Sequence, residues 1–264
     1  MKGKTLVLIP TNSDKTYCIA KFLKNLKKID LSNADVLFSD DTVENEDFAE
    51  LIRSQGFEVI RKSKTIEAIR LGMKLSIVNC LANQRIALRD EFLSRMKKEN
   101  YQFAMWFDSD IIMPKDTIPQ LTSWKEDIVS GIYYQAIRRK DARGKEVIDT
   151  SPVAYKYQDR ESYELGLDNL GSTIKLTELF PSRLIGKEKN DIKITAVGCG
   201  CLLLSRKVMA DSRWQWRWVD GKETTEDMWF SIDVKKLGYE IFVDSHVLCN
   251  HLSRPWKSKV RSLK

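Results

Sequence analysis

Two aspartates separated by one serine stand where an apolar, aromatic segment ends. Asp108 and Asp110 directly follow the run Phe103–Phe107. Side chains at positions i and i+2 of an extended chain project to the same side, so both carboxylates would face one region of space. Two like charges held together need a cation, and oxygen ligands favour a hard divalent ion such as Mg²⁺ or Mn²⁺. The alternative is a turn in which Asp and Ser serve only the backbone.

A second acidic pair, Glu226 and Asp227, stands at the start of a helix predicted over 224–237. With Thr224 as N-cap, Asp227 would complete an approximate capping box, and acids stabilise the positive end of a helix. A carboxylate held at the same place could act as general base toward a hydroxyl nucleophile. Both interpretations remain open from the sequence.

Asp40 and Asp41 end another apolar segment. In α/β nucleotide-binding proteins an acid at this position contacts the base or ribose, whereas turn or N-cap duty is the structural alternative. Arg85 and Arg89 lie one helical turn apart before the Asp108 segment and could pair with phosphate, or could simply cover an exposed helical face.

The chain has two histidines, His246 and His251. A lone histidine more often serves structure than ligation, but His251 ends an apolar run that could direct its imidazole toward a site. Three alternating tryptophans could form an exposed or cleft-facing aromatic ladder that stacks on sugars or bases, or could pack against a neighbouring loop. They are Trp214, Trp216 and Trp218.

The elements that would position these residues alternate between strand and helix in the first half of the chain. Apolar runs predict strands, and amphipathic or capped segments predict helices. The helix predicted over 65–98 should break near Asn83. The strands are 5–9, 35–38, 57–60 and 103–107, and the helices are 14–28, 47–55 and 65–98. This order predicts an α/β fold with a mostly parallel central sheet, helices on both faces, and ligands beyond the carboxyl ends of the strands.

The second half is less regular. Strands are predicted at 127–134 and 153–157 on either side of a charged loop, 138–149, and residues 158–192 show no periodicity. The apolar run 194–204 predicts a strand whose glycines, Gly198 and Gly200, allow close approach by another group. Two further strands, 239–243 and 246–251, close what we interpret as one domain.

Composition limits the class of protein. The 264 residues, 42% hydrophobic and 31% charged, suit one soluble globular domain, and no apolar run reaches the roughly 18 residues of a membrane span. Five scattered cysteines indicate a reducing compartment, which favours the cytoplasm. A net charge of +7 favours an anionic partner. The basic tail 254–264 could contact anionic lipid peripherally, or could be a solvated terminus.

Taken together, these motifs resemble the GT-A fold glycosyltransferases, and those of family 2 in particular. The residues that carry the resemblance are the first strand Leu6–Thr11, the Phe38–Asp41 segment, Phe107-Asp-Ser-Asp110 as a DxD motif, the glycine-bearing strand 196–204, Thr225–Phe230 as an ED motif, and Asn250-His251. Pro-Thr-Asn-Ser replaces the common Tyr-Asn pair after the first strand. No motif of processive polymerising members is present, which favours a single-addition enzyme.

The resemblance implies a role for each matching residue. Mn²⁺ or Mg²⁺ would be held by Asp108, Asp110 and His251. Asp227, beside Glu226, would be the base of an inverting hexosyltransferase. The nucleotide sugar would contact Pro10, Thr11, Asp40, Asp41, Arg85, Arg89, Asp108 and Ser109. The acceptor, a glycan, lipid or protein, would lie near Gly198, Gly200 and Trp229.

By the same resemblance, residues 1–114 would bind the nucleotide sugar and 115–251 the acceptor. Three other functions stay open. A nucleotidyltransferase of similar fold would normally carry a glycine-rich loop, which Pro10–Ser13 lacks. A nucleic-acid binder is disfavoured because the basic residues are spread among acids. A non-catalytic sugar-nucleotide binder would keep the same motifs.

Overall fold

The computed structural model describes residues 3–140, 143–155, 196–214, 217–219 and 222–252. The expectations for the irregular segment 158–192, for Trp216 and for the basic tail lie outside these residues.

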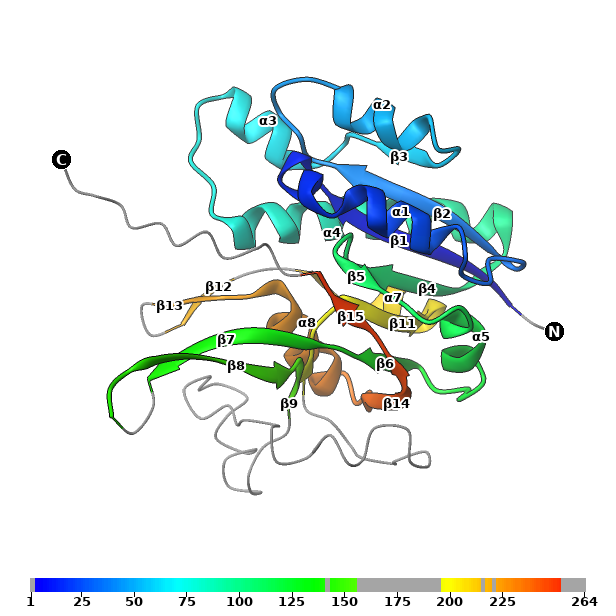
Figure 1. Ribbon diagram of the computed structural model, residues 1–264. Helices are drawn as coiled ribbons and strands as arrows, with labels where there is room; N and C mark the ends of the chain where they lie inside the picture. The colour runs from blue at the N-terminus through cyan, green and yellow to red at the C-terminus, as the bar shows by residue number, and fades with distance from the viewer. Residues whose placement is uncertain (1–2, 141–142, 156–195, 215–216, 220–221, 253–264) are drawn as a thin grey trace.

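A seven-stranded sheet runs through the centre of the protein, in the order β14-β6-β11-β4-β1-β2-β3 (Figure 1). Only β11 is antiparallel to its neighbours, β4 and β6, which confirms the mostly parallel sheet. The strands are β1 (Lys4–Thr11), β2 (Ala34–Asp40), β3 (Glu58–Ile60), β4 (Tyr101–Phe107), β6 (Ile128–Ile132), β11 (Cys201–Ser205) and β14 (Phe242–Leu248).

Helices cover both faces of this sheet, because the central strands are apolar on both sides. Along β1, Leu6 and Leu8 belong to one buried cluster, and Val7 and Ile9 to the other. The first cluster lies under α4 (Ile77–Glu99), α7 (Arg206–Asp211) and α8 (Glu226–Lys236). The second lies under α1 (Ile19–Leu26), α2 (Asp47–Arg53) and α5 (Thr117–Thr122).

The helix predicted over 65–98 is divided into two helices, but the division lies before Ile77 and not near Asn83, so the predicted position of the break is wrong. A short helix, α3 (Lys64–Arg70), ends before Gly72, which has a φ of +80°. Ser76 then caps α4, its hydroxyl oxygen accepting from the Asn79 N–H at 3.2 Å. The helix expected over 14–28 is also divided, into a 3₁₀ helix η1 (Ser13–Tyr17) and α1.

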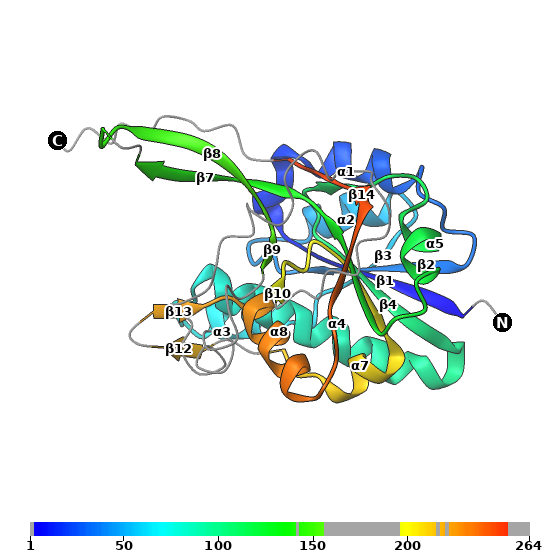
Figure 2. The same cartoon turned by 90° about the horizontal axis from the view of Figure 1, so that it is seen from below.

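The charged segment predicted as a loop over 138–149 is mainly a β-hairpin. Strands β7 (Tyr134–Lys140) and β8 (Glu146–Pro152) pair in register from Tyr134 opposite Pro152 to Lys140 opposite Glu146. This hairpin projects from the body of the protein, as the views in Figures 1 and 2 agree. Outside the main sheet, β12 (Arg217–Val219) pairs with β13 (Lys222–Thr224).

The strand expected over 194–204 is interrupted at its glycines. Its first part, β10 (Ala196–Val197), leaves the main sheet and pairs with β9 (Ala154–Tyr155), and its second part is β11. In the part of the chain that the structure describes, no helix combines the length and the apolar character needed to cross a membrane.

Candidate active site

The candidate site lies beyond the carboxyl end of β4, where the sheet changes from parallel to antiparallel pairing. The backbone N–H of Asp108 donates to the Gly200 carbonyl at 3.1 Å, which fixes the start of the acidic turn against the neighbouring chain. The turn closes when the Ile111 N–H donates to the Asp108 carbonyl at 3.0 Å. Strand β5 (Ile111–Ile112) then pairs with β15 (Asn250–His251), placing His251 opposite Ile111.

Asp110 is the centre of a first charged group. The His251 Nε2 lies 3.5 Å from its Oδ2, and the Tyr17 hydroxyl donates to the same oxygen at 3.2 Å. The Lys15 ammonium forms an ion pair with that oxygen as well. Burial would raise the pKa of Asp110, but the hydrogen bond to His251 and the Lys15 charge outweigh it and lower the pKa to about 2.

Lys15 and Tyr17 were not predicted as site residues. They lie in η1, immediately after β1, and β1 ends at the same edge of the sheet as β4. The only sequence signal for them was their place in the polar segment following the first strand.

Arg85 is the centre of a second charged group. Its side chain is 2% exposed, so the predicted alternative of an exposed helical face is wrong. Its Nη2 donates to Asp108 Oδ1 at 2.8 Å, and its Nε donates to Glu226 Oε1 at 3.1 Å. The guanidinium also lies 5.2 Å from the Trp106 ring centre and 5.5 Å from that of Trp214. Arg85 therefore joins the two acidic motifs through one buried cation.

Glu226 and Asp227 open α8, but Thr225 takes the N-cap position that we expected for Thr224. The Thr225 hydroxyl and the Met228 N–H both donate to Asp227 Oδ1, the latter at 2.8 Å. Burial raises the pKa of Glu226 to about 7, although Arg85 opposes the shift. Burial also raises the pKa of the half-buried Asp227, which is the direction a general base requires.

Gly198 and Gly200 make room for Tyr133. The Gly200 N–H donates to the Tyr133 hydroxyl at 3.3 Å, and a Cβ at position 200 would lie 2.9 Å from the Tyr133 Cζ. The group whose approach these glycines permit is therefore this buried tyrosine. The ring centre of Tyr133 is 6.1 Å from that of His251, so the tyrosine ring packs near the histidine of the site. Tyr133 was not predicted.

The two aspartates after β2 differ in what they contact. Asp40 Oδ1 accepts from the Thr42 N–H at 3.0 Å and from the Thr42 hydroxyl at 2.6 Å. Asp40 therefore stabilises a turn, which was the alternative to a nucleotide contact. Asp41 Oδ2 accepts from the Ser63 hydroxyl at 2.8 Å, whereas its buried Oδ1 has no partner. Burial raises the pKa of Asp41 to about 7. The Thr11 hydroxyl, beside Pro10 at the end of β1, is also buried without a partner.

The remaining predicted residues do not join the two charged groups. Arg89 donates to the carbonyls of Met209 at 3.0 Å and Ala210 at 2.9 Å, so it ties α4 to α7 and we do not retain it as a phosphate ligand. Ser109 is fully buried within the acidic turn. His246 is exposed, with its Nδ1 3.2 Å from Asp244 Oδ1.

Of the aromatic candidates, Trp214 is buried and stacked on Phe230, with ring centres 4.4 Å apart. The expectation of an exposed ladder is therefore wrong for Trp214, and the side chain of Trp218 lies outside the described residues. Trp229 is half-buried in the first turn of α8.

The predicted metal ligands come together only in part. Among the described residues, no three His, Cys, Asp or Glu side chains are arranged to hold a metal ion. Asp110 and His251 do converge, but Lys15 takes the carboxylate oxygen between them and Arg85 takes one oxygen of Asp108. Two carboxylates and an imidazole suit Mn²⁺ or Mg²⁺ chemically. The residue types therefore fit such an ion, whereas the arrangement of these three side chains in the structure does not hold one.

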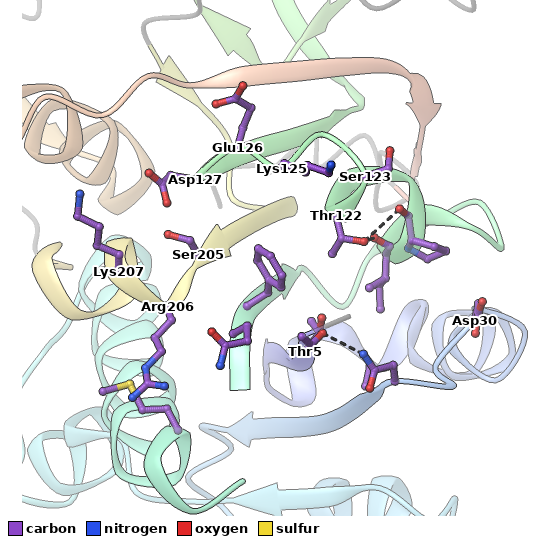
Figure 3. Close-up of a pocket in the computed structure, with 18 of the residues that line it drawn as sticks. Thr5, Asp30, Thr122, Ser123, Lys125, Glu126, Asp127, Ser205, Arg206 and Lys207 are labelled. Atoms are coloured by element: carbon purple, nitrogen blue, oxygen red, sulfur yellow. Dashed lines mark hydrogen bonds between the residues drawn. The ribbon is translucent and has the colours of Figure 1, made fainter. Parts of the chain in front are cut away.

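A large cavity of about 1100 Å³ lies at the opposite end of the sheet (Figure 3). It is lined by residues from the start of β1, such as Thr5, and by Asp127, Ser205 and Arg206. Because Asp108 and Asp110 follow the carboxyl end of β4 and Arg85 links Asp108 to Glu226, we place the candidate site there and not in this cavity.

Comparison with known proteins gives a clear result for the fold. The chain matches a structure of GalNAc-T7 with UDP, GalNAc and Mn²⁺ at a TM-score of 0.54, over 96% of this chain and 44% of that one, with 12% identity. It also matches the mannosyltransferase PcManGT from Pyrobaculum calidifontis in complex with GDP-Man and Mn²⁺ at a TM-score of 0.52, over 98% and 59%, again with 12% identity. The chain has the GT-A fold.

A third structure, A197 from STIV, matches at 14% identity with a TM-score of 0.44, over 95% of this chain and 86% of that one. The chain spans about half the length of the two transferase structures. No protein-family profile matches this sequence, and no curated protein does so.

Proposed function

We propose that this protein is a metal-dependent glycosyltransferase that moves a sugar from a nucleotide-diphosphate donor to an acceptor hydroxyl. The observation that carries the proposal is the acidic cluster at the carboxyl end of β4. There Arg85 joins Asp108 to Glu226, and His251 approaches Asp110. Transferases with nucleotide sugars and Mn²⁺ share the fold, which supports this choice over a nucleic-acid binder.

The donor half of the site would be built from residues 1–114. Asp41 and Thr11, at the ends of β2 and β1, would contact the nucleoside. Mn²⁺ or Mg²⁺ held by Asp108, Asp110 and His251 would stabilise the charge that develops on the diphosphate leaving group. Arg85 would keep Asp108 oriented for this role, since its buried guanidinium makes one hydrogen bond to Asp108 and one to Glu226.

The acceptor half would be built from residues 115–251. Asp227 would accept the proton of the acceptor hydroxyl, which is the arrangement of an inverting transferase. Its position at the helix start is held by Thr225 and Met228, and its raised pKa makes it a stronger base than an exposed aspartate. Gly198, Gly200 and Trp229 would flank the acceptor, with Tyr133 packed beneath the glycines.

A thermal-shift screen of nucleotide sugars with and without Mn²⁺ tests the class directly. We expect one nucleotide sugar to raise the melting temperature, and the rise to depend on the cation. Tight binding of unrelated oligonucleotides with a steep salt dependence, and no response to any nucleotide sugar, would contradict the proposal.

Two substitutions then separate the roles within the cluster. Asp227→Asn should reduce transfer by roughly 10²–10⁴-fold while donor binding is kept, because only the base is lost. Asp110→Ala should abolish the Mn²⁺-dependent part of donor binding. If Asp227→Asn lost donor binding to the same extent, Asp227 would be structural.

A further inference from the structure

The segment between α3 and α4 exposes a concentration of apolar side chains. Of the large hydrophobic residues that are exposed in the described part of the chain, three lie within five positions: Ile69 is 37% exposed, Leu71 74% and Met73 55%. Each of the others stands alone in the sequence. Single exposed apolar residues are ordinary on a protein surface, whereas a cluster of them indicates a partner.

A hydrogen-bonded turn presents these residues at the end of α3. The Gly72 N–H donates to the Ile69 carbonyl at 2.9 Å, and the Met73 N–H donates to the Ala68 carbonyl at 3.0 Å. With the φ of +80° at Gly72, these bonds form a Schellman motif, in which the residue after the glycine usually packs against the helix. Met73 remains exposed instead.

The end of α8 has the same motif with the usual packing. The Gly238 N–H donates to the Lys235 carbonyl at 3.0 Å, and the Tyr239 N–H donates to the Val234 carbonyl at 2.9 Å. There the residue after the glycine, Tyr239, is only 7% exposed. The exposure of Met73 is therefore a property of the segment after α3 and not of the motif.

Three cations flank the apolar residues. Lys64, Arg70 and Lys74 are exposed, and none of them forms an ion pair with another residue that the structure describes. Glu67 is the one acid in the sequence from 64 to 74, so this stretch carries a net positive charge. Exposed apolar side chains among unpaired cations fit a partner that is apolar inside and anionic at its surface.

We propose that Lys64 and residues 69–74, which we call the α3–α4 surface, dock on an anionic lipid bilayer. Leu71 and Met73 would enter the boundary of the acyl chains, and the cations would meet the lipid phosphates. A second copy of the chain fits less well, because a symmetric contact through this surface would bring the same three cations together. Three apolar side chains are also far fewer than the roughly 20–30 residues that each side of a stable protein interface contributes.

The α3–α4 surface lies at the same edge of the sheet as the candidate site. Helix α3 follows the carboxyl end of β3, and the hydroxyl of its N-cap, Ser63, donates to Asp41 at 2.8 Å. In Figure 1 the connection between α3 and α4, in cyan, lies at the outer margin of the molecule. Docking would hold the candidate site near the lipid surface. It goes beyond the proposed function and is independent of it, because docking needs neither a donor nor a metal.

Vesicle flotation with the full chain tests the inference. We expect binding to phosphatidylcholine vesicles that contain the anionic lipid phosphatidylglycerol, and much weaker binding to phosphatidylcholine alone. Leu71→Ser should weaken binding to the anionic vesicles by about tenfold, because the apolar side chain that enters the bilayer is lost. The double variant Lys64→Gln/Lys74→Gln should weaken it by about tenfold or more, since each cation near an anionic surface contributes to binding.

Leu237→Ser is the matched control. Leu237 is also an exposed leucine immediately before the glycine of a Schellman motif, and it follows Lys235 and Lys236 in the sequence. This variant should bind the anionic vesicles as the wild type does. Because both leucines are exposed, both variants should keep the melting temperature of the wild type. Met73→Ser is a second variant in case Leu71→Ser does not fold.

Unchanged vesicle binding in Leu71→Ser and Met73→Ser would overturn the inference, as would an equal loss in Leu237→Ser. Equal binding to vesicles with and without phosphatidylglycerol would contradict the role of the cations. A dimer in analytical ultracentrifugation that Leu71→Ser disrupts would assign the surface to a second copy of the chain instead. If the wild type bound neither kind of vesicle, docking would be wrong, while the proposed function would still be judged by the nucleotide-sugar screen.

Discussion

Replacing Arg85 with methionine isolates the buried cation that joins the two acidic motifs. The substitution keeps much of the side-chain volume but leaves Glu226, which is 5% exposed, without its cation. Breaking a buried ion pair by removing one partner costs about 3–5 kcal/mol. At roughly 2–4 °C per kcal/mol for a chain of this size, the melting temperature should fall by about 6–20 °C.

The size of this loss should depend on pH. Glu226 has a pKa of about 7 in the folded protein, above its ordinary value of 4.5. A carboxyl group whose folded pKa is raised binds its proton more tightly when folded, so the stability that it contributes falls as pH rises from about 4.5 through 7. Without Arg85 the pKa of Glu226 in the folded protein rises further. The difference in the free energy of unfolding between the variant and the wild type should therefore be larger at pH 8.5 than at pH 6.

Chemical denaturation of both proteins at the two pH values measures the effect. Arg95→Met is the control on the same helix, because Arg95 also bonds two carboxylates, Glu58 at 2.6 Å and Glu91 at 3.1 Å, but at the surface. We expect a loss of about 1 kcal/mol or less there, with little change between the two pH values. An Arg85→Met protein no less stable than Arg95→Met, or one whose deficit does not grow with pH, would refute the argument.

Two further substitutions test the support of the site. Gly200→Ala should destabilise the protein by about 1–3 kcal/mol in a denaturant titration, because its Cβ would press on Tyr133. Strict additivity with Tyr133→Ala in a double-mutant cycle would argue against that contact. Asp41 has a pKa raised by burial from 3.8 to about 7, so the stability of the wild type should fall as pH rises from about 4 through 7. Asp41→Asn should flatten that profile, and an unchanged slope would show that Asp41 does not titrate as described.

Much of the fold could be read from local patterns in the sequence. Buried strands such as β1 are continuous apolar runs, and helices end at residues such as Gly238, with a φ of +86° after α8. Errors arose where local signals were ambiguous. The charged segment around 138–149 is polar enough for a loop, yet it pairs as a hairpin, because strand pairing depends on a partner and not on propensity alone.

The acidic motifs of the candidate site were also visible in the sequence, because carboxylates at the ends of apolar segments are local features. Asp108 and Asp110 were identified in this way, and Glu226 and Asp227 from their place at the start of a predicted helix. Parallel pairing aligns the carboxyl ends of β1, β2 and β4 and so explains the edge at which Asp108 and Asp110 lie. Glu226 is linked to that edge through Arg85.

Which cation meets which carboxylate was decided only by the tertiary structure. Lys15 reaches Asp110 across 95 positions, and Arg85 reaches Glu226 across 141. Nothing in the local sequence distinguishes these two cations from the many on the surface, since their effect depends on burial and on the partners that packing supplies. The sequence alone therefore determined the acids and the sheet edge at which Asp108 and Asp110 lie, and the packing of α4 and η1 against that edge determined how their charge is balanced.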